Sequence, residues 1–193
     1  VVGYQQIQGD QYAALYSEIL TVELENDFLP FLYPNQYVNF SPDSEASKLA
    51  LSMVSEDTAD VDALKQIYNY VVNNLTYDYD KAETVETGYL PDVDETLSTK
   101  TGICFDYAAL TTAMLRSCDI PCKLQIGYAG DIKHAWIDVY IRSKGWVTGA
   151  VSFNGDSWSL MDPTFDSSAD SDDTEAIQDY IGNADNYTVQ FTR

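Results

Sequence analysis

Three cysteines and a single histidine are the side chains of this 193-residue chain that suggest nucleophilic chemistry. Cys104 follows Gly102 in "TGICFDYAALTTAML", where the pattern predicts the start of a helix. The helix dipole and the free backbone N–H groups at such a position favour a thiolate and bind an oxyanion. His134 is the only imidazole in the chain, so a thiol–imidazole pair must use it. Each residue also has a structural interpretation, since free cysteines are usually buried and a strand histidine is often structural.

A cysteine–histidine pair needs a third group that orients the imidazole. Asp162, in "LMDPTF", is the best candidate because Pro163 ends its predicted strand there, although an aspartate before proline is also a common turn residue. Asp138 is the alternative, on the same strand face as His134 but awkwardly placed along the strand for Nδ1. Trp136 and Trp158 are candidate substrate-binding side chains.

Composition and charge limit the classes of function. The net charge is −21, from 31 acidic and 10 basic residues, which argues against nucleic acid and anionic membrane surfaces. No run approaches the ~20 apolar residues of a membrane helix. One histidine and no Cys-x-x-Cys pair predict no metal site, and nothing predicts a cofactor. The first residues, "VVGYQQIQGD", lack a starting Met and a signal peptide, so we expect a trimmed or processed piece.

Apolar periodicity predicts helices in the first part of the chain. The helix from residue 41 would have Ser41 as its N-cap and Pro42 at its first position. The segment 78–100 is expected to be a long polar loop. The predicted helices cover residues 10–26, 41–54, 60–75 and 103–117, the last being apolar almost all round and therefore central.

The second part of the chain has the alternation of strands. "CKLQIGYA" and "HAWIDVYI" alternate, and "NGD" predicts a hairpin turn between "GWVTGAVSF" and "SWSLMDPT". The acidic segment "DSSADSDDTE" fails as a calcium loop and is expected to be solvated. Helices followed by an antiparallel sheet indicate an α+β domain.

The motifs "TGICFDYAALTTAMLRSCDIPCKLQIGY", "HAWIDVYI" and "SWSLMDPTFD" together resemble the transglutaminase-like superfamily of the bacterial exported type, which has a papain-like core. The resemblance covers about residues 65–166. It implies Cys104 as the nucleophile, His134 as general base and acid, and Asp162 as the orienting group. We predict an N-terminal helical extension packed on the core over residues 1–60, with a catalytic domain over 61–193. The extension is a candidate docking arm or lid.

The resemblance implies cysteine-dependent acyl transfer on peptide or glutamine amides through a thioester. Proteolysis, deamidation and cross-linking share this intermediate and stay open. The alternative is a non-catalytic protein-binding or cell-surface-binding module. The expected partner is a protein or peptide substrate, with no nucleic acid and no membrane insertion. We expect a monomer located outside the cell or at its surface. A disulfide between Cys118 and Cys122 also stays open, because only four positions separate them.

Overall fold

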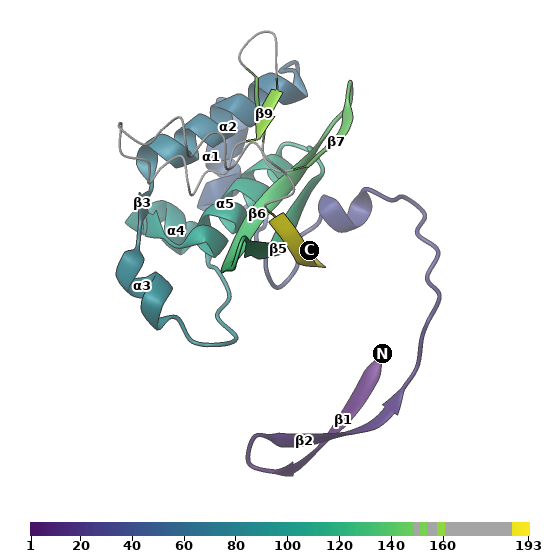
Figure 1. Ribbon diagram of the computed structural model, residues 1–193. Coiled ribbons are helices and arrows are strands. Elements are labelled where there is room, and N and C mark those ends of the chain that lie inside the picture. Colours follow the sequence, from purple (N-terminus) through teal and green to yellow (C-terminus); the bar gives the residue numbers. More distant parts are fainter. Residues whose placement is uncertain (149–150, 154–157, 161–186) are drawn as a thin grey trace.

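The computed structural model describes residues 1–148, 151–153, 158–160 and 187–193. A β-hairpin and an irregular connector precede a group of helices, and an antiparallel sheet follows (Figure 1). The helices are η1 (Leu29–Phe31), α1 (Glu45–Met53), α2 (Asp60–Asn74), α3 (Tyr79–Thr84), α4 (Val93–Thr99) and α5 (Cys104–Ser117). The strands are β1 (Val2–Gln8), β2 (Gln11–Ser17), β3 (Thr76–Tyr77), β4 (Thr101–Gly102), β5 (Cys122–Ala129), β6 (Ile132–Ile141), β7 (Gly145–Val147), β8 (Val151–Phe153), β9 (Trp158–Leu160) and β10 (Tyr187–Thr192).

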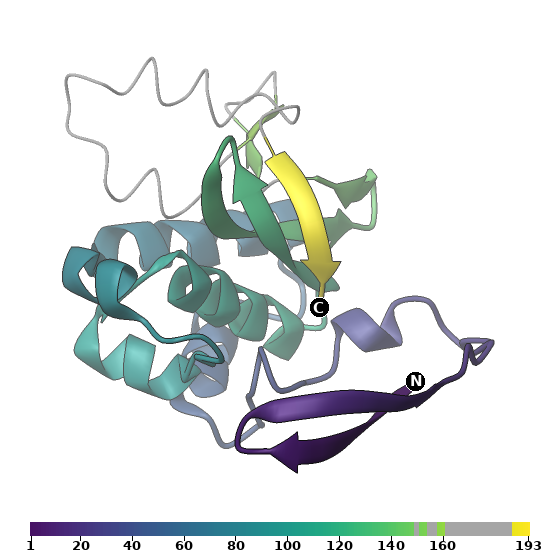
Figure 2. The ribbon, with the colours of Figure 1, turned by 60° about the horizontal axis from the view of Figure 1, so that its bottom comes forward.

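Helix α5 is the centre of the molecule. It packs against α1, α2 and α4 and against β5 and β6, so that helices and sheet enclose it (Figures 1 and 2). Every residue from Asp106 to Arg116 is buried, as expected for a helix that is apolar almost all round. The prediction of a central helix over 103–117 is confirmed, and so is the α+β class.

The main sheet is antiparallel, with the strand order β10-β5-β6-β7. Both faces of β6 are covered. Its residues Ala135, Ile137, Val139 and Ile141 belong to the hydrophobic core. His134, Trp136 and Asp138 are buried on the opposite face. The two strands predicted around residues 122–129 and 134–141 are therefore confirmed, with the expected division of faces.

The predicted helix over residues 10–26 is wrong, because Gln11–Ser17 form strand β2 of the antiparallel hairpin β1–β2 and residues 18–26 form no helix. Gly9 makes the turn with φ +54°, a left-handed value that glycine adopts without strain. The ring of Tyr16 packs over Gly3, where a Cβ atom would lie 2.2 Å from a ring carbon. The spacing of Tyr12, Leu15 and Tyr16 fits a helix face, but the glycine turn and the tyrosine over glycine favour the hairpin.

The segment 78–100 is not the expected loop, because it contains α3 and α4. Asp78 caps α3 by accepting from the Lys81 N–H, and Asp92 caps α4 by accepting from Asp94 and Glu95. Similarly, α1 begins at Glu45 with Ser44 as its N-cap, so the prediction of Ser41 is three residues early. Helix α2 confirms the predicted helix over 60–75. The division of the chain at residue 60 stays a prediction.

Candidate active site

Cys104 is the first residue of α5 and is half-buried. The preceding Ile103 is the N-cap, with extended backbone angles and no side-chain hydrogen bond to the helix. An isoleucine side chain cannot accept a hydrogen bond, so it leaves the N–H groups of the first turn without the usual cap. A glycine is required at position 102 because the backbone there lies close to Asp106. A Cβ atom at Gly102 would lie 2.6 Å from the Asp106 Cβ. The nucleophile candidate therefore stands at a helix N-terminus whose first N–H groups are not capped by the side chain of Ile103.

Tyr77, at the end of β3, lies beside this helix N-terminus. Strand β3 pairs in parallel with β4, which places Tyr77 opposite Gly102. The pKa of the Tyr77 phenol is raised to about 12, first by burial and then by the nearby Cys104 side chain, while the Cys104 backbone N–H acts in the opposite sense. The phenol is therefore protonated at neutral pH and within interaction range of both the thiol and the N–H of Cys104.

The position of His134 follows from the path of the chain after α5. The helix has 14 residues and is about 20 Å long. A tight turn, in which Ile120 N–H donates to the Leu115 carbonyl at 3.1 Å, sends β5 back across the helix. From Cys122 to Gly127, β5 covers about 17 Å. His134 is paired with Gly127, so it lies at the end of the sheet nearest the helix N-terminus.

The described contacts of the His134 ring are aromatic. The imidazole is 5 % exposed and stacks on Trp136, with centroids 6.2 Å apart and an interplanar angle of 13°. Tyr187, at the start of β10, touches both rings, at 6.3 Å from His134 and 5.1 Å from Trp136. These contacts lie on the face of β6 opposite the core, so a direct pairing of His134 with Cys104 stays a prediction.

Trp136 is only 2 % exposed, which leaves little surface for a substrate. Its ring stacks on the His134 imidazole. A contact between Trp136 and substrate stays a prediction. Trp158 begins β9, and nothing is described of its side chain. Asp162, the predicted orienting residue, lies outside the described residues, so its role also stays a prediction.

Asp138, the alternative orienting group, has a different partner. It is four residues from His134 along β6, which corresponds to about 13 Å. Its carboxylate accepts a hydrogen bond from Gln125 Nε2 at 2.5 Å, and Gln125 Oε1 accepts one from Thr192 at 2.7 Å. This polar network joins β6, β5 and β10 across the sheet, and it favours a structural role for Asp138.

The other two cysteines lie at the opposite end of α5. Cys118 is the half-buried C-cap and Cys122 is fully buried at the start of β5, and both thiols are free, so the structure contains no Cys118–Cys122 disulfide. Burial raises the pKa of Cys118 to about 11 and that of Cys122 to about 12. Thiols that stay protonated are poor nucleophiles, so Cys104 is the better candidate.

Three residues that the sequence analysis did not single out surround the first turn of α5. Asp106 is fully buried and accepts hydrogen bonds from the Ile103 N–H, Lys81 Nζ and the Tyr89 hydroxyl. The position of Asp106 three residues after the N-cap was a usable signal, because an acidic residue there often caps the helix. Lys81 and Tyr89 carried no such signal, since only the tertiary structure brings them to this turn.

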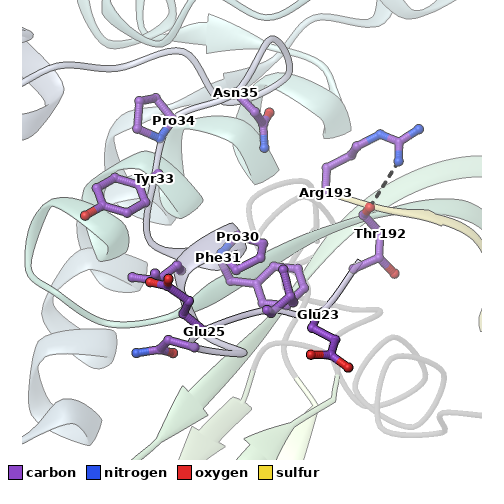
Figure 3. A pocket seen from close by; sticks show the side chains of 12 residues that line it. Glu23, Glu25, Pro30, Phe31, Tyr33, Pro34, Asn35, Thr192 and Arg193 are labelled. Atoms are coloured by element: carbon purple, nitrogen blue, oxygen red, sulfur yellow. Dashed lines mark hydrogen bonds between the residues drawn. The ribbon is translucent and has the colours of Figure 1, made fainter. Parts of the chain in front are cut away.

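A pocket of about 700 Å³ lies away from these residues. Figure 3 shows it between the connector and the end of β10, with Glu23, Tyr33 and Arg193 around it. Trp146, another aromatic side chain near this connector, packs on Phe28, Phe31 and Tyr140. None of these residues belongs to the predicted catalytic set.

The described residues contain no group of three or more His, Cys, Asp or Glu side chains arranged to hold a metal ion. Among the same residues, no helix has the length and apolar character needed to cross a membrane.

The chain is similar to several known proteins. Over 57 residues the chain is 42 % identical to the UPF0252 protein MJ1282 of Methanocaldococcus jannaschii, covering 27 % of this chain and 16 % of that protein. A proposed cysteine protease from Cytophaga hutchinsonii has a similar structure, with a TM-score of 0.57 and 21 % identity over 89 % of this chain. The periplasmic domain of TgpA from Pseudomonas aeruginosa has a TM-score of 0.50 and 18 % identity over 75 % of this chain.

The chain spans 48 % and 49 % of the length of these two solved structures, and at these identities the likeness shows the fold alone. The model of the transglutaminase-like superfamily matches residues 47–149, which is more than half of the chain. The match includes Cys104 and His134 and begins inside the predicted N-terminal extension. The protein belongs to the transglutaminase-like superfamily.

Proposed function

We propose that the protein catalyses acyl transfer on peptide or glutamine amides, with Cys104 as the covalent nucleophile. The observation that carries this proposal is the position of Cys104 as the first residue of a buried helix whose N-cap, Ile103, offers no acceptor to the helix. Such an end favours a thiolate and presents N–H groups to an oxyanion. Membership of the superfamily and the similarity in fold to a proposed cysteine protease support the same chemistry.

In the proposed mechanism, the Cys104 sulfur attacks the amide carbonyl carbon and forms a tetrahedral oxyanion. His134 holds the thiol proton and transfers it to the departing amine or ammonia, which leaves a thioester. Asp162 orients the imidazole. Water or a primary amine then attacks the thioester, His134 takes the proton of that nucleophile, and the thiol is restored. Water gives hydrolysis or deamidation, and a lysine amine gives a cross-link.

Tyr77 is our candidate for the second oxyanion donor, beside the Cys104 N–H. A phenol with a pKa of about 12 keeps its proton at neutral pH and can donate a hydrogen bond to a developing negative charge. The Cys104 N–H interacts with the Tyr77 oxygen. An oxyanion bound between the two groups would replace this contact and receive a hydrogen bond from each.

The proposed setting is extracytoplasmic, with a protein or peptide as substrate and a monomer as the active form. Similarity to a periplasmic domain of known structure supports the location, and the strongly acidic surface supports solubility rather than nucleic-acid binding. Peptide amides are neutral and lysine amines are cationic, so a protein with a net charge of −21 does not repel either substrate.

A covalent trapping experiment tests this proposal. The protein is incubated with a mixed protein substrate such as casein, together with a fluorescent primary amine, and the products are analysed by mass spectrometry. We expect an acyl adduct on the peptide that contains Cys104, which hydroxylamine releases as a hydroxamate. Amine incorporation, ammonia release and new N-termini distinguish cross-linking, deamidation and proteolysis. The matched variants are His134→Ala, expected to lose the adduct, and Lys144→Ala on the β6–β7 turn, expected to keep it. An adduct on Cys118 instead, or none on any cysteine, contradicts the proposal.

A further inference from the structure

A closed group of polar side chains lies directly behind the nucleophile candidate, and we name it the Asp106 cluster (Lys81, Tyr89 and Asp106). Asp106 Oδ2 accepts from Lys81 Nζ at 2.8 Å, and Oδ1 accepts from the Tyr89 hydroxyl at 2.5 Å. Lys81 Nζ also donates to the Tyr89 oxygen at 2.7 Å. Each member therefore contacts both others, and the carboxylate in the middle is fully buried.

The Asp106 cluster connects three segments of the chain. Lys81 comes from α3, Tyr89 from the segment before α4, and Asp106 from the first turn of α5. Asp106 Oδ2 also accepts from the Ile103 N–H at 2.8 Å. The Tyr89 ring lies edge-on to Phe105, with centroids 6.3 Å apart. The cluster thus contacts the residues on both sides of Cys104.

Capping alone does not explain the cluster. The Ile103 N–H needs one acceptor, and the Asp106 carboxylate satisfies it without help from Lys81 or Tyr89. A buried ion pair is also weak evidence for stability, because the cost of removing both charges from water often cancels their attraction. Lys81 and Tyr89 have a further effect, because they hold both oxygens of the Asp106 carboxylate in one orientation. The oriented carboxylate in turn fixes the turn 103–106.

We propose that Asp106, Lys81 and Tyr89 are positioning residues for acyl transfer, which fix the turn that presents the Cys104 thiol and N–H. The kinetic part of this inference rests on the proposed function, whereas the geometry of the turn does not. Displacement of a reacting group by about 1 Å can cost about a hundredfold in rate, so a turn held from three segments has a direct catalytic value.

The first measurement is the rate of iodoacetamide alkylation of Cys104 relative to Cys118 in the same molecule. Tyr89→Phe removes only the hydroxyl, and Lys81→Met keeps most of the side-chain volume. In each variant we expect the Cys104-to-Cys118 ratio to fall at least about fivefold, because the thiol loses its place at the helix end. The double variant is expected to lose little more than the worse single one, within about twofold, because the residues act as a unit. Tyr33→Phe, an exposed tyrosine near the other end of α5, is the matched control.

The second measurement is a steady-state comparison of the same variants with the acyl-transfer substrate found by trapping. We expect kcat to fall about tenfold while KM stays within about twofold, because the cluster contacts the nucleophile turn and not the substrate. An unchanged or raised alkylation ratio overturns the inference, and so does a parallel change of both thiols with a lowered Tm, since that would show a general loss of structure. If the wild type transfers no acyl group, the proposed function fails while the alkylation ratio still decides the positioning role.

Discussion

The two ends of α5 carry the same functional group in opposite settings. Cys104 opens the helix at a half-buried position, next to a protonated phenol and a buried carboxylate. Cys118 closes the helix, also half-buried, and its pKa is raised to about 11 by burial. At the first end the helix dipole favours a thiolate, and at the second it opposes one. Both residues are half-buried, and the thiols differ in the burial that raises the pKa of Cys118 and in their places on the helix.

The polar groups at the two ends also differ in kind. At the first end, side chains from three segments converge on the Asp106 carboxylate. At the second end, the buried Arg116 guanidinium donates to three backbone carbonyls of the described residues, those of Tyr33, Cys122 and Arg193. The first arrangement orients a turn that carries a thiol, whereas the second joins the connector, β5 and β10 to the helix. The proposed function assigns chemistry to the first end and stability to the second, and the first three of the four predictions below test this contrast.

Removing each of the two thiols in turn is expected to give the largest difference in turnover. Cys104→Ala removes the covalent nucleophile, and turnover should fall at least about 10³-fold, as removal of a nucleophile does in other triads. Cys118→Ala should leave turnover within about twofold of the wild type, because its thiol takes no part in the mechanism. Steady-state kinetics on both variants, with circular dichroism to check folding, makes the comparison. Retained activity in Cys104→Ala would end the contrast.

The second largest difference is expected between the rates at which the Cys104 and Cys118 thiols are alkylated at neutral pH. A pKa of about 11 instead of the ordinary 9.0 leaves about a hundredfold less thiolate on Cys118 at neutral pH. Cys118 and Cys122 should therefore react much more slowly than Cys104 in the native protein. Mass spectrometry of iodoacetamide-treated protein over a pH series measures this. Equal rates for Cys104 and Cys118 at neutral pH would contradict the assigned settings.

Substitution of Arg116 tests the stabilising end. Burial lowers the pKa of the guanidinium, but an arginine remains charged, and three backbone carbonyls depend on it. Arg116→Met leaves these acceptors without a donor, and the free energy of unfolding should fall by about 2 kcal/mol. Urea denaturation measures the loss. The rate of Cys104 alkylation in the native state should stay within about twofold, since the change lies a helix length away. A selective loss of Cys104 reactivity would show that the two ends are coupled.

A smaller, pH-dependent effect is expected at an ion pair away from both ends. The pKa of Asp60, the first residue of α2, is lowered by the hydrogen bonds from Arg142. A lowered pKa in the folded state contributes stability above the unfolded value of ~3.9, and this contribution is lost as the pH falls through the folded pKa. Asp60→Asn should therefore cost about 1 kcal/mol near neutral pH, because solvent screens the exposed Arg142. The difference from the wild type should vanish in acid, and a constant difference down to about pH 2 would refute the linkage.

Much of the core could be predicted because its patterns are local. Helix α2 shows apolar residues every three or four positions, and β6 alternates between two buried faces, so both appear in the sequence with nearly their observed bounds. The hairpin β1–β2 was missed because Tyr12, Leu15 and Tyr16 have helical spacing. Two strands without a covering layer are marginal in water, and nearly all their side chains are exposed. Strand β10 was missed because its edge position depends on β5.

Residue identity and short-range periodicity are enough to predict the order of the motifs, the central helix and the single imidazole. The course of β5 back from the end of α5, and the pairing of His134 with Gly127, appear only in the folded chain. The tertiary structure also decided that Lys81 and Tyr89 meet Asp106, although 25 and 17 positions separate them in the chain. Such contacts depend on the packing of whole elements, and no local pattern of residues encodes that packing.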